Sequence, residues 1–424
     1  MTIIDIISKK RDSKELSKEE INFWITEMMN DNIADYQVSA LLMAIVLNGM
    51  TYEETFYLTD AMVNSGNIIN LSDIDGIKID KHSTGGVGDK ITIILAPLLA
   101  SFGLKMAKMS GRGLGYTGGT ADKLESIPGY KLELNSDEFI KQVKDIGISI
   151  ISQSDNIALA DKKLYALRDT TGTVSSISLI AASIMSKKIA SGADLIFIDL
   201  KVGDGALIKT LEEAKELANT MVRIGESFNK KVIIMLTNMD EPLGYAIGNS
   251  LEIMESIDTL KGMGPSDVME IIIKIAGIVV SYANDISVEE AEAWCFKKIN
   301  NGDAHAKFEE WINAQGGNLE ALELSDRIVS IRSVSSGYIT KIKTEALGEL
   351  ARQIGAGRMR KEDNISYKAG IVLSKKLGEY VEENEELAKV YLDERDARLG
   401  DFLECFVLEA EQTNKKPLIY EIIG

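Results

Sequence analysis

Two glycine-rich segments combine lysines, hydroxyls and backbone amides in a way that suits an anion. The first runs from Lys81 to Asp89 and reads KHSTGGVGD. Glycines let backbone N–H groups approach an anion closely, and a helix after the segment would add the positive end of its dipole. A lysine and two hydroxyls beside such amides suit one phosphate group. The same residues also fit a tight turn with an exposed lysine, and one loop alone leaves both interpretations open.

The second segment, from Lys108 to Thr120, reads KMSGRGLGYTGGT and repeats this combination of residues. Each segment follows a predicted strand, Ile77–Asp80 or Leu104–Met109, and precedes a predicted helix. Because the carboxyl ends of parallel strands face one crevice, the two loops together favour an anion site there.

A helical stretch farther along the chain carries a second group of polar residues. Ser183 and Lys187 are four residues apart and share one helix face, and Arg168 with Tyr165 precedes them. Such a face could hold a planar ligand rich in carbonyls, although on these residues alone a solvated charged face is the favoured interpretation. His82 in the first loop could donate a proton to a leaving group or could be a turn residue without that role.

Composition excludes several classes of function. The 424 residues include 47 Lys and Arg against 65 Asp and Glu, a net charge of −18, which disfavours nucleic acid as a partner. The two cysteines, Cys295 and Cys405, lie far apart and fit a reducing compartment. The N-terminus has no apolar signal core, and the longest apolar stretch, 271–283, is short and contains Lys274. We therefore expect a cytoplasmic protein with no membrane partner.

The organisation of the chain predicts an α/β fold with a helical domain, a large α/β domain with a mostly parallel sheet, and a C-terminal α+β region. Capping signals predict three helices in the first 65 residues: Ser17 with Glu20, Asp35, and Thr51 with Glu54. The helical stretch 159–193 contains no predicted strand and could pack on these helices. The expected domains are 1–66 plus 159–193 (helical), 77–158 plus 194–325 (α/β), and 326–424 (C-terminal).

The run KHSTGGVGD followed by KMSGRGLGYTGGTADKLE resembles the signature of the thymidine/pyrimidine-nucleoside phosphorylase family. The segments YALRD and SIMSKKIASGAD resemble it too, and the similarity covers essentially the whole chain in one register. The resemblance implies the same three-part fold, an active site in the cleft between the helical and α/β domains, and a homodimer formed through the helical domain.

The resemblance also implies roles for individual residues. His82, Arg168 and Lys187 would be catalytic. The base side would comprise Tyr165, Arg168, Ser183 and Lys187. The phosphate side would comprise Lys81, Ser83, Thr92, Lys108, Met109, Ser110 and Thr120. A potassium ion is expected near Gly88, Lys90, Leu243, Ala246 and Glu255, the first four acting through main-chain carbonyls, and no organic cofactor is expected.

The implied reaction is phosphorolysis of uridine, thymidine and deoxyuridine to the free base and α-D-ribose 1-phosphate or its 2-deoxy form. Lys108 favours the broader pyrimidine-nucleoside enzymes, because members strict for deoxynucleosides tend to carry Met there. Two positions depart from the family pattern: Tyr116 replaces the usual His, and Gly172 begins a run that is usually Ala-Thr-Val.

Three alternatives fit the sequence as well. A strict thymidine phosphorylase is one. An anthranilate-type phosphoribosyltransferase would need a carboxylate site for magnesium, and the sequence shows no clear acidic pair beside these loops. A non-catalytic binder would be expected to have lost Lys81, Arg168 or Lys187, and all three are present.

Overall fold

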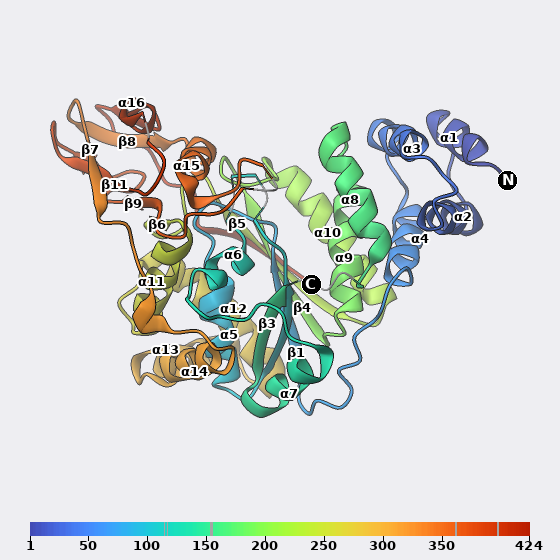
Figure 1. The fold of residues 1–424 in the computed structure, drawn as a ribbon, viewed down its shortest axis with the longest axis horizontal. Helices are drawn as coiled ribbons and strands as arrows, with labels where there is room; N and C mark the ends of the chain where they lie inside the picture. Colours follow the sequence, from blue (N-terminus) through green and yellow to red (C-terminus); the bar gives the residue numbers. More distant parts are fainter. Residues whose placement is uncertain (114, 117, 153–155, 361–362, 397) are drawn as a thin grey trace.

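The computed structural model describes residues 1–113, 115–116, 118–152, 156–360, 363–396 and 398–424. Figure 1 shows a central α/β layer, with a bundle of N-terminal helices on one side and C-terminal strands on the other. The helices are α1 (Ile3–Arg11), α2 (Lys18–Met29), α3 (Asp35–Asn48), α4 (Tyr52–Val63), α5 (Ile91–Ala100), α6 (Thr120–Glu125), α7 (Ser136–Ile146), α8 (Leu159–Thr171), α9 (Ile177–Ala190), α10 (Leu211–Ser227), α11 (Asn249–Leu260), α12 (Ser266–Asn284), α13 (Val288–Asn300), α14 (Asp303–Ala314), α15 (Thr344–Ala351) and α16 (Leu399–Leu403). The strands are β1 (Lys78–Ser83), β2 (Lys105–Ser110), β3 (Ile148–Ser152), β4 (Leu195–Val202), β5 (Lys231–Asn238), β6 (Ala246–Ile247), β7 (Arg327–Arg332), β8 (Gly337–Ile342), β9 (Gly370–Leu373), β10 (Tyr380–Val381), β11 (Glu386–Leu392), β12 (Phe406–Glu409) and β13 (Ile419–Ile423).

The helical bundle forms where the capping signals predict it. Ser17 and Thr51 each accept a bond from the backbone three residues on, and the glutamate there bonds back, so both capping boxes are confirmed. Asp35 begins α3 but does not cap it, because Ala34 is the N-cap residue. The prediction of three helices was wrong by one, since Thr2 caps a further helix, α1. Residues of α8 and α9 share one apolar core with α1–α4, so the 159–193 stretch does pack on the bundle.

The central sheet of the described residues has six strands in the order β13-β5-β4-β1-β2-β3. The four pairings among β1 to β5 are parallel, and only β13 runs antiparallel, beside β5. Helices α5 and α11–α14 cover one face and α9 and α10 the other. Because β1 and β2 are neighbours, the two glycine-rich loops that follow them start side by side at the same edge of the sheet.

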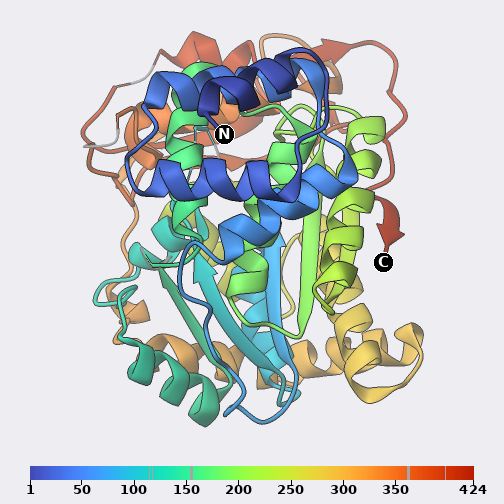
Figure 2. The same ribbon diagram turned by 90° about the vertical axis from the view of Figure 1, so that its right-hand side faces the viewer.

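The C-terminal region consists of two small antiparallel sheets, β6-β9-β11-β7 and β10-β8-β12. Two strands cross the expected boundary at residue 326. Strand β6 comes from the α/β part of the chain and joins the first small sheet, whereas β13 pairs with β5 of the central sheet. Figure 2 shows the terminal arrow of β13 apart from the other C-terminal strands. Each of the two parts of the chain therefore contributes one strand to a sheet of the other.

No single helix among the described residues combines the length and the apolar composition of a membrane span. Helices α12 and α13 reach that composition only as a pair bent by 115°. The apolar residues of both helices belong to the core that packs beneath the central sheet.

Candidate active site

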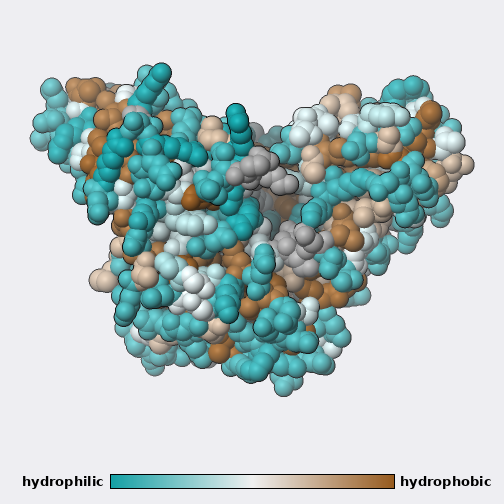
Figure 3. Space-filling model, in the orientation of Figure 1, coloured by the Kyte–Doolittle hydropathy of each residue, from teal (hydrophilic) through white to brown (hydrophobic). Residues whose placement is uncertain are grey.

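One cleft of about 990 Å³ separates the helical bundle from the glycine-rich loops. In the space-filling view of Figure 3 the molecule is hollowed between its two upper arms. Eleven residues singled out in the sequence line this cleft from both sides: His82, Ser83, Thr92, Lys108, Met109, Ser110 and Thr120 from the α/β layer, and Tyr165, Arg168, Ser183 and Lys187 from α8 and α9. We call these the anion wall and the base wall.

The first glycine-rich loop connects β1 to α5 above a buried layer of charges. Lys81 has no exposed surface and does not line the cleft; its ammonium lies 3.5 Å from an Asp199 carboxylate oxygen and 3.9 Å from one of Asp89. Among the described residues the Lys81 ammonium has no hydrogen bond. Burial opposes the charge of Asp89, but Lys81 and Lys201 outweigh it and lower the pKa of Asp89 far below its ordinary value. The layer thus holds the Lys81 ammonium beneath the loop, balanced by two buried carboxylates.

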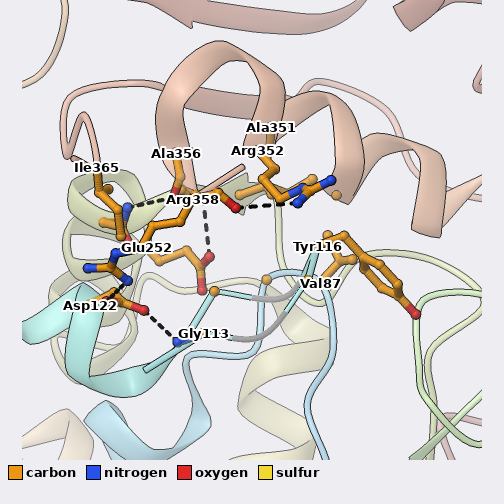
Figure 4. Close-up of a pocket in the computed structure, with 18 residues that line it drawn as sticks. Val87, Gly113, Tyr116, Asp122, Glu252, Ala351, Arg352, Ala356, Arg358 and Ile365 are labelled. Carbon is orange, nitrogen blue, oxygen red and sulfur yellow. Dashed lines mark hydrogen bonds and ion pairs between the residues drawn. The ribbon is translucent and has the colours of Figure 1, made fainter. Parts of the chain in front are cut away.

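The second glycine-rich loop is held by Asp122 at the start of α6. One carboxylate oxygen of Asp122 accepts the Gly113 backbone N–H at 2.6 Å (Figure 4). The other oxygen accepts bonds from Arg112 at 3.2 Å and Arg358 at 2.9 Å. Arg358 belongs to the C-terminal region, which therefore helps to shape this loop. Tyr116, the residue that departs from the family pattern, donates its hydroxyl to the Ala206 carbonyl at 3.2 Å. Thr117 and Leu114 lie outside the described residues.

Asp80 joins the two walls below the cleft. Its carboxylate lies 3.4 Å from the Lys108 ammonium on β2 and 2.8 Å from the Lys188 ammonium on α9. Burial and the charge of Lys188 lower the pKa of Lys108 to about 7, although Asp80 acts in the opposite direction. A cleft lysine therefore changes its charge near neutral pH.

His82 lies at the floor of the cleft and is neutral at physiological pH. Burial and the positive charges of Lys188 and Lys108 hold the pKa of His82 well below its ordinary value of 6.5. A neutral imidazole offers one N–H donor and one acceptor. His82 can therefore donate a hydrogen bond to a ligand, but it is not an imidazolium that could transfer a proton as a general acid.

The base wall is organised by two cations. Arg168 is buried and donates to the carbonyls of Thr173 at 3.2 Å, Val174 at 2.8 Å and Leu179 at 3.1 Å. These bonds hold the connection between α8 and α9, which Gly172 starts with a left-handed φ of +67°, a conformation that favours glycine. A guanidinium has five N–H groups, so three bonds leave donors for a ligand in the cleft.

Lys187 is the other cation of this wall. Its ammonium is paired with the Asp161 carboxylate and lies 3.0 Å from the Ser183 hydroxyl. The Tyr165 ring lies below both cations, 5.8 Å from the Lys187 ammonium and 5.9 Å from the Arg168 guanidinium. The four predicted residues of this wall therefore form one polar surface.

The expected potassium ligands also lie together, but Lys90 meets the others through its side-chain ammonium and not through its carbonyl. The Lys90 side-chain ammonium lies 3.0 Å from the carbonyl oxygens of Leu243 and Ala246 and is paired with the Glu255 carboxylate. Burial opposes this charge, yet Glu255 and Glu252 outweigh it and raise the pKa of Lys90 above its ordinary value. The ammonium thus occupies the position at which the oxygens converge.

Sequence reasoning missed the carboxylates that position the predicted cations. Asp161, Asp80 and Asp199 are all buried and each lies beside a lysine. Asp161, Tyr165 and Arg168 are spaced i, i+4, i+7 on α8, so helical spacing could have placed Asp161 on the base wall. Asp80 and Asp199 stand inside buried strands, and nothing in their spacing distinguishes them.

Comparisons with known proteins identify the family of each part of the chain. Residues 75–305 match the a/b domain of the glycosyl transferase family, residues 4–66 its helical bundle domain, and residues 338–399 the pyrimidine nucleoside phosphorylase C-terminal domain. Pyrimidine-nucleoside phosphorylases from two strains of Staphylococcus aureus are each 47% identical over 431 residues, which cover 100% of this chain and of each relative.

Among solved structures, anthranilate phosphoribosyltransferase from Thermus thermophilus is similar with a TM-score of 0.58 and 17% sequence identity, covering 73% of this chain and 99% of that one. This likeness concerns the fold alone and supports the pairing of a helical bundle with an α/β layer. The full-length identity and the matched C-terminal domain go further. The chain belongs to the pyrimidine-nucleoside phosphorylase family.

Proposed function

We propose that this protein catalyses phosphorolysis of pyrimidine nucleosides, giving the free base and a pentose 1-phosphate. The observation that carries the proposal is the single cleft in which the anion wall and the base wall face each other. The full-length similarity to named pyrimidine-nucleoside phosphorylases supports the same reaction. Phosphate would be bound on one wall and the pyrimidine on the other, with the sugar between them.

The anion wall would position phosphate rather than activate it, because phosphate is already anionic at neutral pH. Donors for its oxygens are the loop amides and the hydroxyls of Ser83, Thr92, Ser110 and Thr120, and Lys81 adds charge from beneath the loop. Held in this way, a phosphate oxygen attacks C1′ as the bond from C1′ to the base nitrogen breaks. The product is the α-anomer of the pentose 1-phosphate, because attack comes from the face opposite the departing base.

The base wall would stabilise the pyrimidine as it leaves with the bonding electrons. Arg168 and Lys187 offer positive charge to its carbonyl oxygens, Ser183 bonds the ring N3 edge, and neutral His82 donates to O2. Donors that meet developing charge in such a site are each worth about 3–4 kcal/mol of barrier. Tyr165 would shape the surface on which the ring lies.

The substrate range proposed is the broad one: uridine, thymidine and deoxyuridine. Lys108 supports it, since this residue lines the cleft and members of the family that are strict for deoxynucleosides tend to carry Met there. A strict thymidine phosphorylase remains the alternative. Lys108→Met is expected to shift the ratio of efficiencies with uridine and thymidine toward thymidine, whereas an unchanged ratio would contradict the role of Lys108.

We also propose a homodimer that works in the cytoplasm. Helix α3 presents an apolar stripe to solvent at i, i+7 and i+11, formed by Tyr36 (77% exposed), Met43 (38%) and Leu47 (74%). Ile4 of α1, 62% exposed, is a further apolar residue on the outside of the same bundle. Contiguous exposed apolar surface is typical of an interaction site, and a second copy of this helical bundle is the occupant that we propose.

The deciding experiment is a direct assay. The protein is incubated with uridine, thymidine or deoxyuridine, with and without phosphate, and the ultraviolet change on release of free base is followed. Phosphate-dependent release is the expected result. No release with any of the three nucleosides would reject the proposal. If the protein instead condensed anthranilate with phosphoribosyl pyrophosphate and released pyrophosphate, that result would favour the transferase alternative.

A further inference from the structure

The buried ammonium of Lys90 lies inside a set of oxygens that would otherwise suit a monovalent cation. Lys90 is the last residue before α5, and its side chain has no exposed surface. Its nitrogen lies 3.0 Å from the Leu243 carbonyl, 3.0 Å from the Ala246 carbonyl and in contact with the Glu255 carboxylate. A lysine ammonium has three N–H donors, so these three oxygens use all of them.

The backbone around this nitrogen leaves no room for a separate potassium ion beside it. A Cβ on Gly88 would lie 2.5 Å from the Leu243 oxygen, and a Cβ on Gly244 would lie 2.2 Å from the Glu255 carboxylate and 2.9 Å from the Lys90 nitrogen. Both glycines also have left-handed φ values, +76° and +68°. The backbone therefore closes around the ammonium on two sides, and a separate potassium ion does not fit beside it.

Two lysines, Lys90 and Lys376, donate hydrogen bonds to the carbonyl groups of the 242–246 loop. Lys376 donates to the carbonyls of Pro242 and Gly244 and lies 3.1 Å from the Asp267 carboxylate. The carbonyls of residues 242, 243, 244 and 246 thus all accept bonds from one of two buried ammonium groups. Carbonyl groups that converge in this way need a cation to offset their mutual repulsion, and here the chain supplies it.

From this geometry we infer that Lys90 is a built-in replacement for the potassium ion, so that this enzyme needs no monovalent cation. An ammonium carries the same single positive charge as potassium and is satisfied by oxygen ligands at a similar distance. The family resemblance implies a main-chain carbonyl role for Lys90, whereas in the structure its side chain takes the ion's place. The inference revises the expected cofactor and leaves the proposed reaction unchanged.

The bonds of Lys90 also fix the position of the neighbouring residue Asp89, which lines the cleft. Lys90 follows Asp89, which lines the cleft, and Asp89 is held from the other side by the Lys123 ammonium on its carbonyl at 2.6 Å. Fixing Lys90 to the 243–246 loop and α11 therefore fixes the end of the first glycine-rich loop. We assign Lys90 as a positioning residue that does not touch the substrate.

The test compares the wild type with Lys90→Ala and Lys90→Met in buffers that contain either potassium or tetramethylammonium, a cation too large for the oxygen set. Thermal unfolding is the main readout, because it does not depend on the proposed reaction. The wild type is expected to unfold at the same temperature in both buffers. Lys90→Ala is expected to lose on the order of 5 °C without potassium and to recover saturably as potassium is added.

Lys90→Met is the matched control, since its side chain fills the space without a charge. Its unfolding temperature is expected to stay low in both buffers. Turnover with a nucleoside and phosphate follows the same pattern if the proposed function holds; if no variant has activity, the unfolding data still decide the role of Lys90. Recovery of Lys90→Met by potassium, or no recovery of Lys90→Ala, would overturn the inference.

A second measurement keeps the inference testable if Lys90→Ala does not fold. Wild-type crystals soaked in thallium(I), a heavy analogue of potassium, are expected to show no anomalous signal between Leu243, Ala246 and Glu255. A thallium peak at that position in the wild type would overturn the inference. A saturable rise of the wild-type unfolding temperature with potassium, absent with tetramethylammonium, would overturn it too.

Discussion

The carboxylate of Asp161 and the ammonium of Lys187 form an ion pair that joins the first turn of α8 to the last turn of α9. The side chain of Asp161 is 3% exposed, whereas that of Lys187 is 22% exposed and faces the cleft. The buried acid therefore orients a partly exposed base-wall cation. Because Lys187 is proposed to meet the charge that develops on the leaving pyrimidine, Asp161 is expected to affect turnover without touching the substrate.

Asp161→Asn is expected to lower kcat strongly and to change KM little. Hydrogen bonds to charged groups contribute about 1.5–3 kcal/mol, so losing this one should slow turnover by about 10- to 150-fold. Steady-state kinetics with a pyrimidine nucleoside and phosphate measure both constants. Asp169→Asn is the matched control, because Asp169 is an exposed aspartate on the same helix, and it should leave kcat unchanged. Equal effects of the two substitutions would contradict the positioning role.

Lys187→Ala is expected to lower turnover by about 10²- to 10³-fold, since it removes one donor that meets developing charge. It also leaves the buried carboxylate of Asp161 without its partner, so the unfolding temperature should fall as well. The double variant Lys187→Ala with Asp161→Asn should recover part of that temperature but none of the turnover. Turnover near that of the wild type in Lys187→Ala would show that this lysine is not catalytic.

The affinity for phosphate should depend on pH through Lys108. With a pKa of about 7 in the free enzyme, Lys108 is charged below pH 7 and loses its charge as the pH rises. A bound phosphate anion favours the charged form, so above pH 7 binding must take up a proton. The KM for phosphate is therefore expected to rise by as much as about tenfold per pH unit between pH 7 and 8.

Lys108→Met serves as the reference for this pH dependence. Phosphate itself titrates in the same range, and that effect is common to both proteins. The quantity to compare is the ratio of the two KM values for phosphate at each pH. A ratio that stays constant from pH 6 to 9 would show that Lys108 does not titrate with the bound anion.

Leu47→Asp is expected to weaken the proposed dimer, because it places a charge in the apolar stripe of α3. Light scattering coupled to size exclusion should report twice the mass of one chain for the wild type and a shift toward a single chain for the variant. Leu207→Asp is the control, since Leu207 is an exposed leucine, 47% accessible, outside the bundle. A monomeric wild type would reject the dimer.

The sequence predicts the parts of this fold that local signals determine. Capping boxes located α2 and α4, and the glycine-rich loops marked the ends of β1 and β2. Both loops and the Ser183–Lys187 face do reach one cleft, because the strand ends and the α8–α9 pair are adjacent in the fold. The residues of the loops predicted an anion site, whereas the cleft shared with the Ser183–Lys187 face was implied by the family resemblance and not by the spacing of those residues.

Other features depend on contacts that no local pattern records. The partner of Lys187 comes 26 positions earlier in the chain, and the carbonyls that surround the Lys90 ammonium come more than 150 positions later. Strand β13 reads Ile-Tyr-Glu-Ile-Ile, and nothing in this short run indicates pairing with β5. Buried lysines are recognised only when the carboxylates and carbonyls that balance them are seen.

The pairing of β13 with β5 has a consequence for biosynthesis. Strand β5 emerges long before β13, because the whole antiparallel region lies between them in the chain. Until β13 is made, the edge of β5 has unpaired N–H and C=O groups that could recruit a foreign strand. Nascent chains halted before residue 419 should thus be prone to aggregation. A fusion tag placed near Gly424 would lie next to the β13–β5 pairing and is expected to disturb it.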